Sequence, residues 1–579
     1  QADPLGFAFT EGSDLVAPFN AAIQSMKADG TLAALNGKYF GTAFTISYDD
    51  IGDGAYAEEV AEPVYGGTLR VGLEAETDGL NPAVNRFAVS AYQMGNSVYD
   101  YLVRVEDTPC GCVYVPSLAE SWTHSDDLLE WDFKLREGVT FHDGTPLTSE
   151  AALFAFKMQL TDPTVGIAIR AFFKADDPET DFFEPAQIID DYTIRFHAKR
   201  PHVDFPNVFT GQLGMIPSLA YMQAATEDGS LNQAPVGTGP FMFDSRVQDS
   251  MTRFVRNPNY WGGDVYLDAI EFYIYTDGEL AAGAMAAGDI DTMGTSNTEA
   301  ILTLRGLEAD GYQLYETDEG EETFSMMNAG RPPFDDIRAR KALTYAFARD
   351  DFVEFIGAGV LRPADQAFNP ESPFFNPDVR QEHDTPDLAT PLVAEYCADV
   401  PDMCTDGKIN AEYQYSGPSV IQDRTYDLLT DGWSDHFNFT KDMVLQDDHI
   451  THAILGMYDF ITWRQFGGRN PDGHILWTSC DSIGPLSLNW PRLCDPARDE
   501  LMYAARASDD REANVGLWQQ WAENINQSYT YLFQTHTMWN NSYSPRVRNM
   551  CGYVLTDGSL PRCHVGGGAI AWSQMWIEE

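Results

Sequence analysis

Strand-like and helix-like hydrophobic patterns alternate along the chain from residue 66 onward. Residues 67–73 predict an opening strand, and residues 267–275, which are rich in Ile, Phe and Tyr, predict a second, buried strand. The Ala-rich residues 279–287, which end at Gly288, predict a helix directly after that strand. This alternation of strands and helices is typical of an α/β protein.

At 579 residues the chain is longer than one hydrophobic core usually supports, so we expect two or more lobes. Apolar residues make up 44% of the chain and aromatic residues 13%, which indicates a globular protein rather than a disordered one. No apolar run approaches the ~18 residues that a membrane-spanning helix needs.

The chain carries 88 acidic and 36 basic side chains, which gives a net charge of −52. A field of this sign repels phosphate backbones and anionic lipid headgroups, so we expect neither nucleic acid nor a membrane surface as a partner. The acidity favours solubility of an exported protein over recognition of a cationic ligand. No signal-peptide pattern is present at the start of the sequence, so we expect the mature or trimmed form of an exported protein, from which the signal peptide has been removed.

Several motifs occur in a fixed order along the chain. In one, a Pro-containing turn at residues 257–259 runs into Tyr260, Trp261 and two glycines. In another, the run from Pro332 to Asp336 leads into a helical pattern. The segments that carry the motifs are residues 66–71, 116–144, 237–241, 254–293 and 328–350. Together they resemble the family 5 solute-binding proteins of ABC importers, which include dipeptide, oligopeptide and nickel binders.

This resemblance implies an α/β, two-lobe periplasmic-binding-protein fold of the large, cluster C type. Lobe I would take residues 63–327 and 535–579, with an extra subdomain at residues 105–235, and lobe II would take residues 328–534. Because the chain crosses between the lobes twice, near Met327 and near Gln534, we expect the two crossings to act as a hinge.

The first 41 residues resemble the carboxyl-terminal end of a different family, the family 3 amino-acid binders. The similarity lies in residues 27–31 and 38–41, which match that family's Lys-x-Asp-Gly-Thr turn and its Lys-Tyr-Phe-Gly close. Residues 42–62 are rich in acidic side chains and are interpreted as a linker. One alternative hypothesis gives this fragment a receptor-like or scaffolding role, in which it recruits a partner. Deleting residues 1–62 would test this, because solute binding would then persist while the complex is lost.

Eight cysteines fall in pairs that are close in sequence. The pairs are Cys110 with Cys112, Cys397 with Cys404, Cys480 with Cys494, and Cys551 with Cys563. An even count in short loops favours disulfides formed in an oxidising compartment. A zinc site is the weaker interpretation, because zinc requires four converging ligands and only Cys563 and His564 are adjacent. The bridge between Cys110 and Cys112 is geometrically the least favourable.

The chain lacks the sequence motifs of common enzymes: there is no His-Glu-x-x-His helix, no Gly-x-Ser-x-Gly elbow and no phosphate-binding Gly-rich loop. His142 and Asp143 could suggest acid–base catalysis, but they lie in a predicted hairpin turn, which favours a structural role for the Asp side chain. We therefore expect no enzyme, no catalytic residue, no cofactor and no metal. An extracellular hydrolase remains the alternative from another class.

The family resemblance implies a cleft between the lobes and suggests which residues line it. In family 5 a lobe II loop of the form Trp-x-x-Asp precedes a Pro-containing turn, and in the peptide binders its Asp pairs with the terminal ammonium. Here Trp463 and Pro471-Asp472 match, but Gln465, Phe466 and Gly467 stand where the acid would be. The candidate contacts are Glu74, Thr77 and Tyr99 from lobe I, and Trp463, Arg464, Phe466, Arg469, Asn489 and Trp490 from lobe II.

A buried ammonium without a counter-charge is costly, so the missing acid disfavours ordinary peptides bound in the family's standard way. Arg464 and Arg469 offer cationic forks, and Trp463, Phe466 and the nearby tryptophans offer flat faces for a ring. If Trp463 stacks on the solute, we expect Trp463→Ala to weaken binding while the ligand-free protein keeps its stability.

We predict a periplasmic or extracellular receptor that captures a peptide or peptide-like solute between its lobes and delivers it to the permease domains of an ABC transporter. The alternative within the same fold is an oligosaccharide or another solute that stacks on aromatic rings. We expect the receptor to act as a monomer.

Overall fold

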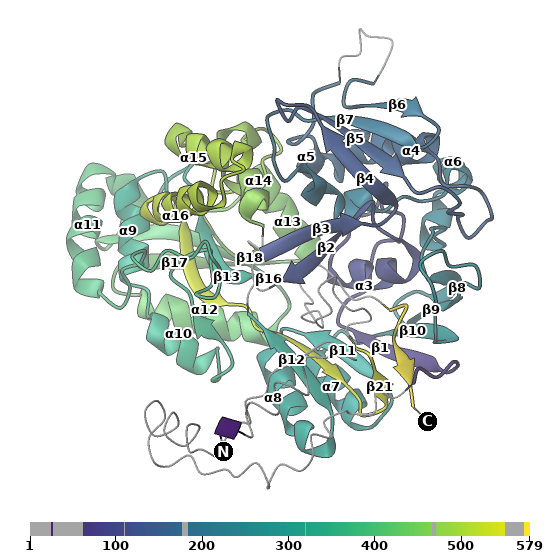
Figure 1. Ribbon diagram of the computed structural model, residues 1–579. Helices are drawn as coiled ribbons and strands as arrows, with labels where there is room; N and C mark the ends of the chain where they lie inside the picture. Colours follow the sequence, from purple (N-terminus) through teal and green to yellow (C-terminus); the bar gives the residue numbers. More distant parts are fainter. Residues whose placement is uncertain are drawn as a thin grey trace. The chain divides into compact units, whose positions relative to one another are not determined.

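The computed structural model describes residues 25–26, 62–108, 111–176, 183–318, 320–465, 470–550 and 572–578. The chain divides into two compact units, residues 1–63 and 64–579, and the second unit is described here (Figure 1). Apart from residues 25–26 and 62, the family 3-like fragment and the linker lie outside the described residues.

A seven-stranded sheet forms the first lobe, with the strand order β12-β20-β11-β1-β10-β9-β8. The strands are β1 (Thr68–Leu73), β8 (Phe241–Val247), β9 (Met251–Arg256), β10 (Ala269–Ile274), β11 (Thr292–Thr295), β12 (Gln313–Thr317) and β20 (Trp539–Tyr543). β1 is parallel to both of its neighbours, β10 and β11, so the carboxyl ends of these three strands lie at one edge of the sheet. The strands predicted at residues 67–73 and 267–275 are confirmed as β1 and β10.

A second seven-stranded sheet forms the other lobe, with the order β14-β19-β13-β18-β16-β15 and with β17 paired to β16. Its strands are β13 (Glu322–Met327), β14 (Arg362–Pro363), β15 (Cys404–Thr405), β16 (Lys408–Ser416), β17 (Phe437–Val444), β18 (Phe460–Gln465) and β19 (Tyr531–His536). The sequence assigns residues 322–327 to lobe I, and this is wrong, because β13 pairs with β18 and β19. We infer that lobe II begins near residue 320 rather than at residue 328.

The chain passes between the two sheets twice, once between Thr317 and Glu322 and once between His536 and Trp539. The two crossings are hydrogen-bonded to each other: the backbone amide of Thr537 donates to the carbonyl of Glu321 over 2.7 Å, and Nε1 of Trp539 donates to the Glu321 carboxylate over 2.8 Å. They therefore form a short double connection, which is the arrangement that a hinge between two lobes requires.

The subdomain contains a four-stranded sheet in the order β4-β5-β7-β6 and a separate strand pair, β2 and β3. Its strands are β2 (Val103–Thr108), β3 (Gly111–Pro116), β4 (Ala119–His124), β5 (Glu130–Leu135), β6 (Ala186–Asp190) and β7 (Thr193–His197). Its core is aromatic: the ring centroids of Phe133 and Phe196 lie 5.7 Å apart, and those of Phe196 and Phe209 lie 4.5 Å apart. This core is distinct from the cores of both seven-stranded sheets.

Helices cover the sheets (Figure 1). Those of lobe I and its subdomain are α3 (Val89–Val98), α4 (Ser149–Thr161), α5 (Gly166–Ile169), α6 (Leu219–Glu227), α7 (Gly278–Ala286) and α8 (Thr298–Gly306). Those of lobe II are α9 (Ile337–Tyr345), α10 (Arg349–Phe355), α11 (Pro386–Asp399), α12 (Val420–Gly432), α13 (Gln446–Leu455), α14 (His474–Thr478), α15 (Pro496–Ala507) and α16 (Arg511–Gln527). None of the described helices is long and apolar enough to cross a bilayer.

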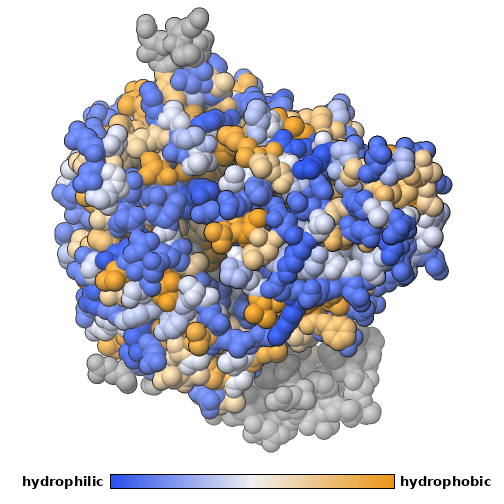
Figure 2. All heavy atoms as spheres, turned by 180° about the vertical axis from the view of Figure 1, so that it is seen from behind, coloured by the Kyte–Doolittle hydropathy of each residue, from blue (hydrophilic) through white to orange (hydrophobic). Residues whose placement is uncertain are grey.

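Two helices that the sequence predicts are confirmed with their caps. α7 follows β10 closely, and the Asp277 carboxylate accepts hydrogen bonds from the amides of its first turn. α9 follows the run that ends at Asp336, whose carboxylate accepts from the Arg338 amide and so caps the helix. Hydrophilic side chains cover most of the molecular face in Figure 2, and hydrophobic ones form small groups, which agrees with the high net charge.

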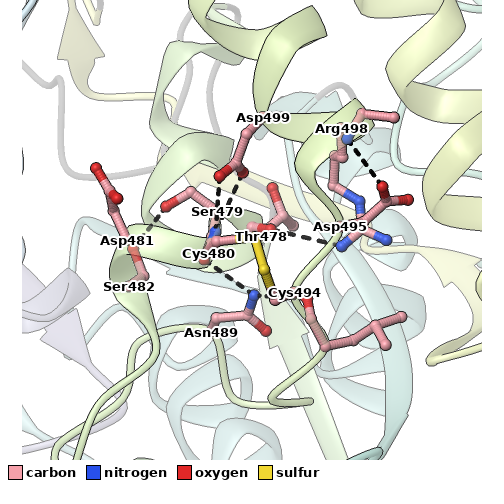
Figure 3. Close-up of a disulfide and its surroundings, with 12 residues drawn as sticks. Thr478, Ser479, Cys480, Asp481, Ser482, Asn489, Cys494, Asp495, Arg498 and Asp499 are labelled. Carbon is pink, nitrogen blue, oxygen red and sulfur yellow. Dashed lines mark hydrogen bonds between the residues drawn. A yellow bond between two sulfur atoms is a disulfide. The ribbon is translucent and has the colours of Figure 1, made fainter.

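Two of the predicted disulfides are confirmed, Cys397–Cys404 and Cys480–Cys494. Cys110, Cys551 and Cys563 lie outside the described residues. The Cys480–Cys494 bridge closes the polar loop shown in Figure 3, where the Cys480 amide also donates to the Asp499 carboxylate over 3.1 Å. The bridge therefore fixes the loop that connects α14 to α15.

Loss of the Cys480–Cys494 bridge should destabilise lobe II. The bridge spans a sequence separation of 14, and removing a loop constraint of this size costs about 3 kcal/mol. We expect Cys480→Ser/Cys494→Ser to lower the free energy of unfolding by about that amount in urea titrations. Cys397→Ser/Cys404→Ser, which opens a separation of only 7, serves as the control and should lose less. Equal losses would contradict the loop-length account.

Candidate functional site

The candidate site lies where the carboxyl ends of β1 and β11 meet the end of β18 from the other sheet. Glu74 directly follows β1, and the hydroxyl of Thr295, the last residue of β11, donates a hydrogen bond to its Oε1. From β18, Nη1 of Arg464 donates to Oγ of Ser296 over 2.6 Å. Ligands of open α/β sheets bind at the carboxyl ends of such parallel strands. The structure therefore brings two predicted residues, Glu74 and Arg464, into one neighbourhood between the sheets.

Glu74 is a partly buried carboxylate with unused hydrogen-bonding capacity. Burial raises its pKa, while the hydrogen bond from Thr295 and the positive charge of Arg464 act in the opposite direction. A Cβ atom at Gly278, the first residue of α7, would lie 2.6 Å from Oε1 of Glu74, so glycine leaves the room that the carboxylate occupies. Among the described residues, Oε2 of Glu74 has no hydrogen-bond partner. This oxygen can accept a hydrogen bond from a donor group of a solute.

Arg464 is already engaged by the protein. Besides Ser296, its Nε lies 3.7 Å from Oε1 of Glu321, and its guanidinium lies 5.3 Å above the ring of Trp539. These contacts reach the first sheet, the hinge and β20. Arg464 therefore links the lobes. Only part of its guanidinium group is free to bind a solute carboxylate, whereas the sequence predicts that the whole group is available.

Trp463 and Trp490 lie in one aromatic row on lobe II. The Trp463 ring stacks on His449, with centroids 5.2 Å apart and planes 12° apart, and it lies 4.5 Å from the ring of Trp490. Trp490 in turn lies 4.7 Å from Trp477. Burial lowers the pKa of His449 to about 4, so this ring is neutral at physiological pH. Much of the Trp463 ring therefore already contacts other rings of the lobe.

Trp490 is 5% exposed, and its Nε1 has no hydrogen-bond partner in the part of the chain that the structure describes. A buried indole N–H normally finds a partner. The indole of Trp463, in contrast, donates to Oε1 of Gln465 over 3.0 Å. The Trp490 ring therefore packs against the neighbouring rings, while its indole N–H is an unsatisfied hydrogen-bond donor.

Three other predicted contacts are structural residues, and we remove them from the candidate set. The Thr77 hydroxyl donates to the carbonyl of Gly79 over 3.0 Å, and Tyr99 is a core residue that is 2% exposed and donates to the carbonyl of Leu80. Asn489 is 1% exposed and donates to the carbonyls of Ser479 and Leu493 within the disulfide loop (Figure 3).

Phe466 and Arg469 lie outside the described residues, so their predicted contacts stay predictions. The catalytic interpretation of His142 and Asp143 finds no support: the Asp143 carboxylate accepts from the Thr145 amide over 2.9 Å and from the Ser218 hydroxyl, as the turn interpretation expects. No group of three or more His, Cys, Asp or Glu side chains converges as metal ligands within the described ranges.

Thr295, Ser296 and Glu321 are site residues that the sequence does not indicate. β11 has only four residues, Thr-Met-Gly-Thr, and shows no hydrophobic alternation, so the pattern after α7 does not predict a strand there. The available signal is topological: a parallel neighbour of β1 must end beside Glu74.

Trp463→Ala should reduce the stability of the ligand-free protein, because the ring packs against His449 and Trp490. This corrects the expectation from sequence that stability would be kept. We expect the ligand-free variant to lose about 2 to 3 kcal/mol of unfolding free energy. Trp463→Phe, which keeps an aromatic ring, should recover more than half of that loss. Calorimetry on both variants measures this, and unchanged stability in Trp463→Ala would show that the packing is dispensable.

The model of one family, bacterial extracellular solute-binding proteins, family 5 Middle, matches residues 113–447. The chain belongs to this family. Family 5 solute-binding proteins are binding proteins and not enzymes, and they act in the periplasm or outside the cell. The predictions of family, of a non-enzymatic role and of localisation are thereby confirmed. The resemblance of the first 41 residues to family 3 stays a prediction.

Curated relatives of this family 5 protein align over most of its length. Di/tripeptide-binding protein 2 of Pseudomonas aeruginosa (strain UCBPP-PA14) is 25% identical over 522 residues, which cover 87% of this chain and 96% of that protein. The dipeptide-binding protein of Escherichia coli (strain K12) is 23% identical and covers 86% and 94%. Heme-binding protein A of Haemophilus influenzae (strain ATCC 51907 / DSM 11121 / KW20 / Rd) is 26% identical and covers 82% and 88%.

Solved structures show the same two-lobe periplasmic-binding-protein fold, as the sequence predicts. The ABC transporter-associated periplasmic binding protein DppA from Helicobacter pylori, in complex with peptide STSA, matches with a TM-score of 0.75 at 20% identity, covering 89% of this chain and 99% of that one. AgaA from A. tumefaciens R10, in complex with agropinic acid, matches with a TM-score of 0.74 at 19% identity, again covering 89% and 99%.

Proposed function

We propose that this family 5 protein captures a peptide or peptide-like solute between its lobes and delivers it to an ABC importer, and that Glu74 accepts the solute's terminal ammonium. The observation that carries the proposal is Oε2 of Glu74, a carboxylate oxygen between the lobes without a partner among the described residues. Di/tripeptide-binding relatives and a peptide complex of the same fold support the solute class.

The proposal accounts for the missing acid in the lobe II loop. A buried ammonium requires a negative partner, because an unpaired buried charge costs several kcal/mol. Glu74 supplies that charge from lobe I, and Arg464, which donates to the neighbouring Ser296, supplies a cation close to it. An ammonium and a carboxylate or carbonyl of one solute would then each meet a group of opposite polarity.

An oligosaccharide or another aromatic-stacked solute is the second candidate. The row from Trp463 through Trp490 to Trp477 favours it, since flat apolar faces suit sugar rings. The row is weakened as a stacking platform because its rings already contact one another and His449. A neutral sugar also brings no positive charge to pair with Glu74.

A thermal-shift screen of the ligand-stripped protein tests the proposal. The panels are short peptides, the same peptides with acetylated amino termini, and oligosaccharides. A ligand present at 100 times its Kd adds about 2.7 kcal/mol of stability. We expect the free peptides to raise the melting temperature and the acetylated peptides to raise it far less. A response to oligosaccharides alone would overturn the peptide assignment, and an equal response to free and acetylated peptides would overturn the role of Glu74.

A further inference from the structure

The subdomain and lobe II contact each other along a narrow polar surface, which we call the seam. On the subdomain side it consists of Tyr114, Phe172 and residues 199–204. On the lobe II side it consists of residues 470–481 and of Tyr503 and Arg506 from α15. In Figure 1 the seam runs between α5 and the pair α14 and α15. Apart from Trp477, which ends the aromatic row, it contains none of the candidate-site residues that the structure describes.

The buried part of the seam is built around Asp472. Its carboxylate accepts two hydrogen bonds from Arg506, over 2.6 and 2.8 Å, and Nε2 of His202 lies 3.2 Å from its Oδ2. The three residues are between 2% and 5% exposed. Beside them the backbone amide of Val203 donates to the carbonyl of Arg506 over 2.9 Å. His202 and Val203 are therefore the subdomain's contribution to a charged cluster that otherwise belongs to lobe II.

Further polar contacts extend the seam on both sides of this cluster. The Asn470 amide donates to the Tyr114 hydroxyl over 2.7 Å and to the Asp204 carboxylate over 3.0 Å. The Asp481 carboxylate, which belongs to the disulfide loop in Figure 3, accepts from Lys199 and from Arg200. The Arg200 guanidinium also lies 4.2 Å above the ring of Tyr503. Both ends of the seam thus consist of polar contacts rather than interlocked apolar side chains.

The two sides of the seam belong to separate cores. Phe205, directly after the subdomain segment, lies in the aromatic core of the subdomain, whereas Ile475 and Met502 lie in the core of lobe II. If the sides part, Asp472 keeps its two hydrogen bonds to Arg506 within lobe II, and His202 loses one contact. A buried ion pair is costly to break when one of its charges is left buried without a partner. Opening of the seam leaves no buried charge in that state. The seam can therefore open without unfolding either side.

We propose that the seam is a latch that parts when the lobes open and re-forms when they close. His202 and Asn470 are then positioning residues: they set the lifetime of the solute-bound state without touching the solute. The extra subdomain is then part of the closing device and not only an addition to lobe I. The inference rests on the two-lobe binding function and not on the chemical class of the solute.

Hydrogen exchange of the Val203 amide in the ligand-stripped protein tests the latch, because its hydrogen bond crosses the seam. The reference is the Ala198 amide, which donates to Leu129 within the subdomain over 2.8 Å. We expect Val203 to exchange at least 10-fold faster than Ala198, since exchange of Val203 requires only opening of the seam and exchange of Ala198 requires unfolding of the subdomain.

Two variants separate the latch from simple packing. His202→Phe keeps a ring against Phe172 and Phe205 but removes the Nε2 donor, whereas His202→Gln keeps a donor. We expect His202→Phe to raise the exchange rate of Val203 about 10-fold without changing that of Ala198, and His202→Gln to restore part of the protection. Asn470→Ala should act in the same direction as His202→Phe.

Exchange of Val203 and Ala198 at one common rate in the wild type would overturn the proposal, because the seam would then open only on unfolding. A parallel rise of both rates in His202→Phe would overturn it as well, since it would assign His202 to the stability of the subdomain. As a functional readout, a pool of tripeptides bound to the wild type should dissociate about 10-fold faster from His202→Phe. If no peptide binds the wild type, the solute assignment fails while the exchange result still decides the latch.

Discussion

Glu74→Gln should weaken the binding of a free peptide by about 2 to 4 kcal/mol, which corresponds to about 30- to 1,000-fold in Kd, because truncating one partner of a buried, hydrogen-bonded charge pair leaves the other charge unpaired. The substitution keeps the shape of the side chain and its hydrogen bond from Thr295. Isothermal titration of a peptide identified in the thermal-shift screen measures the effect.

The stability of the ligand-free variant shows whether a loss of affinity comes from misfolding. Burial raises the pKa of Glu74, which means that the folded protein disfavours its charged form at neutral pH. Removing the charge should therefore leave the free energy of unfolding unchanged or increase it. Glu227→Gln, an exposed residue of α6, makes the same charge change away from the site and should alter neither affinity nor stability.

The pH dependence of peptide affinity follows from the same shift. The ammonium pairs with the ionised form of Glu74, so affinity should be present above its pKa and lost as the pH falls through it. Because that pKa is raised, the loss should begin at a higher pH than for an ordinary glutamate, whose pKa is about 4.3. Glu74→Gln should show no such loss over this range. Equal affinities of the two proteins at all pH values would contradict the role of Glu74.

Elements with a strong local pattern could be predicted from the sequence. Examples are β1, β10, α7 and α9. Each combines a hydrophobic run or period with a turn or capping residue next to it, so each could be predicted. The predicted start of lobe II lies about eight residues too late, since β13 is apolar enough to fit either sheet and only its pairing with β18 decides. Local propensity contains no information about a strand's partner.

The candidate site could be predicted only in part, and the reason differs between residues. Glu74 follows a recognisable strand, so its position at the end of that strand could be predicted. Tyr99 and Asn489 are polar residues next to loops, and whether such a residue faces a cleft or satisfies a buried carbonyl depends on packing that the sequence does not show. The contact between His202 and Asp472 joins segments far apart in the chain. The Pro471-Asp472 turn is recognisable in the sequence, but nothing there indicates that Asp472 contacts His202.

These outcomes have a common physical basis. The two lobes and the subdomain each have their own apolar core, whereas the contacts between them are polar: Arg464 with Ser296, Asn470 with Asp204, and His202 with Asp472. Polar contacts can part into water at low net cost, because water replaces each lost hydrogen bond. Separate apolar cores keep each body intact while such contacts open and close, as capture of a solute by two lobes requires.

Asp472→Asn should be the most destabilising of the substitutions considered, with a loss of about 3 to 5 kcal/mol of unfolding free energy, because it leaves the buried guanidinium of Arg506 without its counter-charge. Burial alone would raise the pKa of Asp472, but the charge of Arg506 and the contact with His202 outweigh it and hold the pKa well below the ordinary value. The carboxylate therefore stays ionised in the folded protein.

The sign of the pH dependence follows from this lowered pKa. Asp472 contributes its stabilisation in full above the ordinary aspartate pKa of about 3.9, and the contribution is lost as the pH falls toward the folded-state pKa. The difference in unfolding free energy between wild type and Asp472→Asn should thus be constant from pH 7 to pH 5 and shrink below about pH 4. Urea titrations at a series of pH values measure it.

Two further variants determine whether the loss comes from the unpaired charge. Asp472→Leu/Arg506→Met removes both charges and should recover much of the stability that Asp472→Asn loses, because replacing a buried pair with apolar groups of similar size is often neutral. Asp268→Asn breaks the exposed pair with Arg256 and should leave the urea midpoint unchanged. If the double variant were no more stable than Asp472→Asn, the loss would come from the shape of the site rather than from an unpaired Arg506, and the charge account would be wrong.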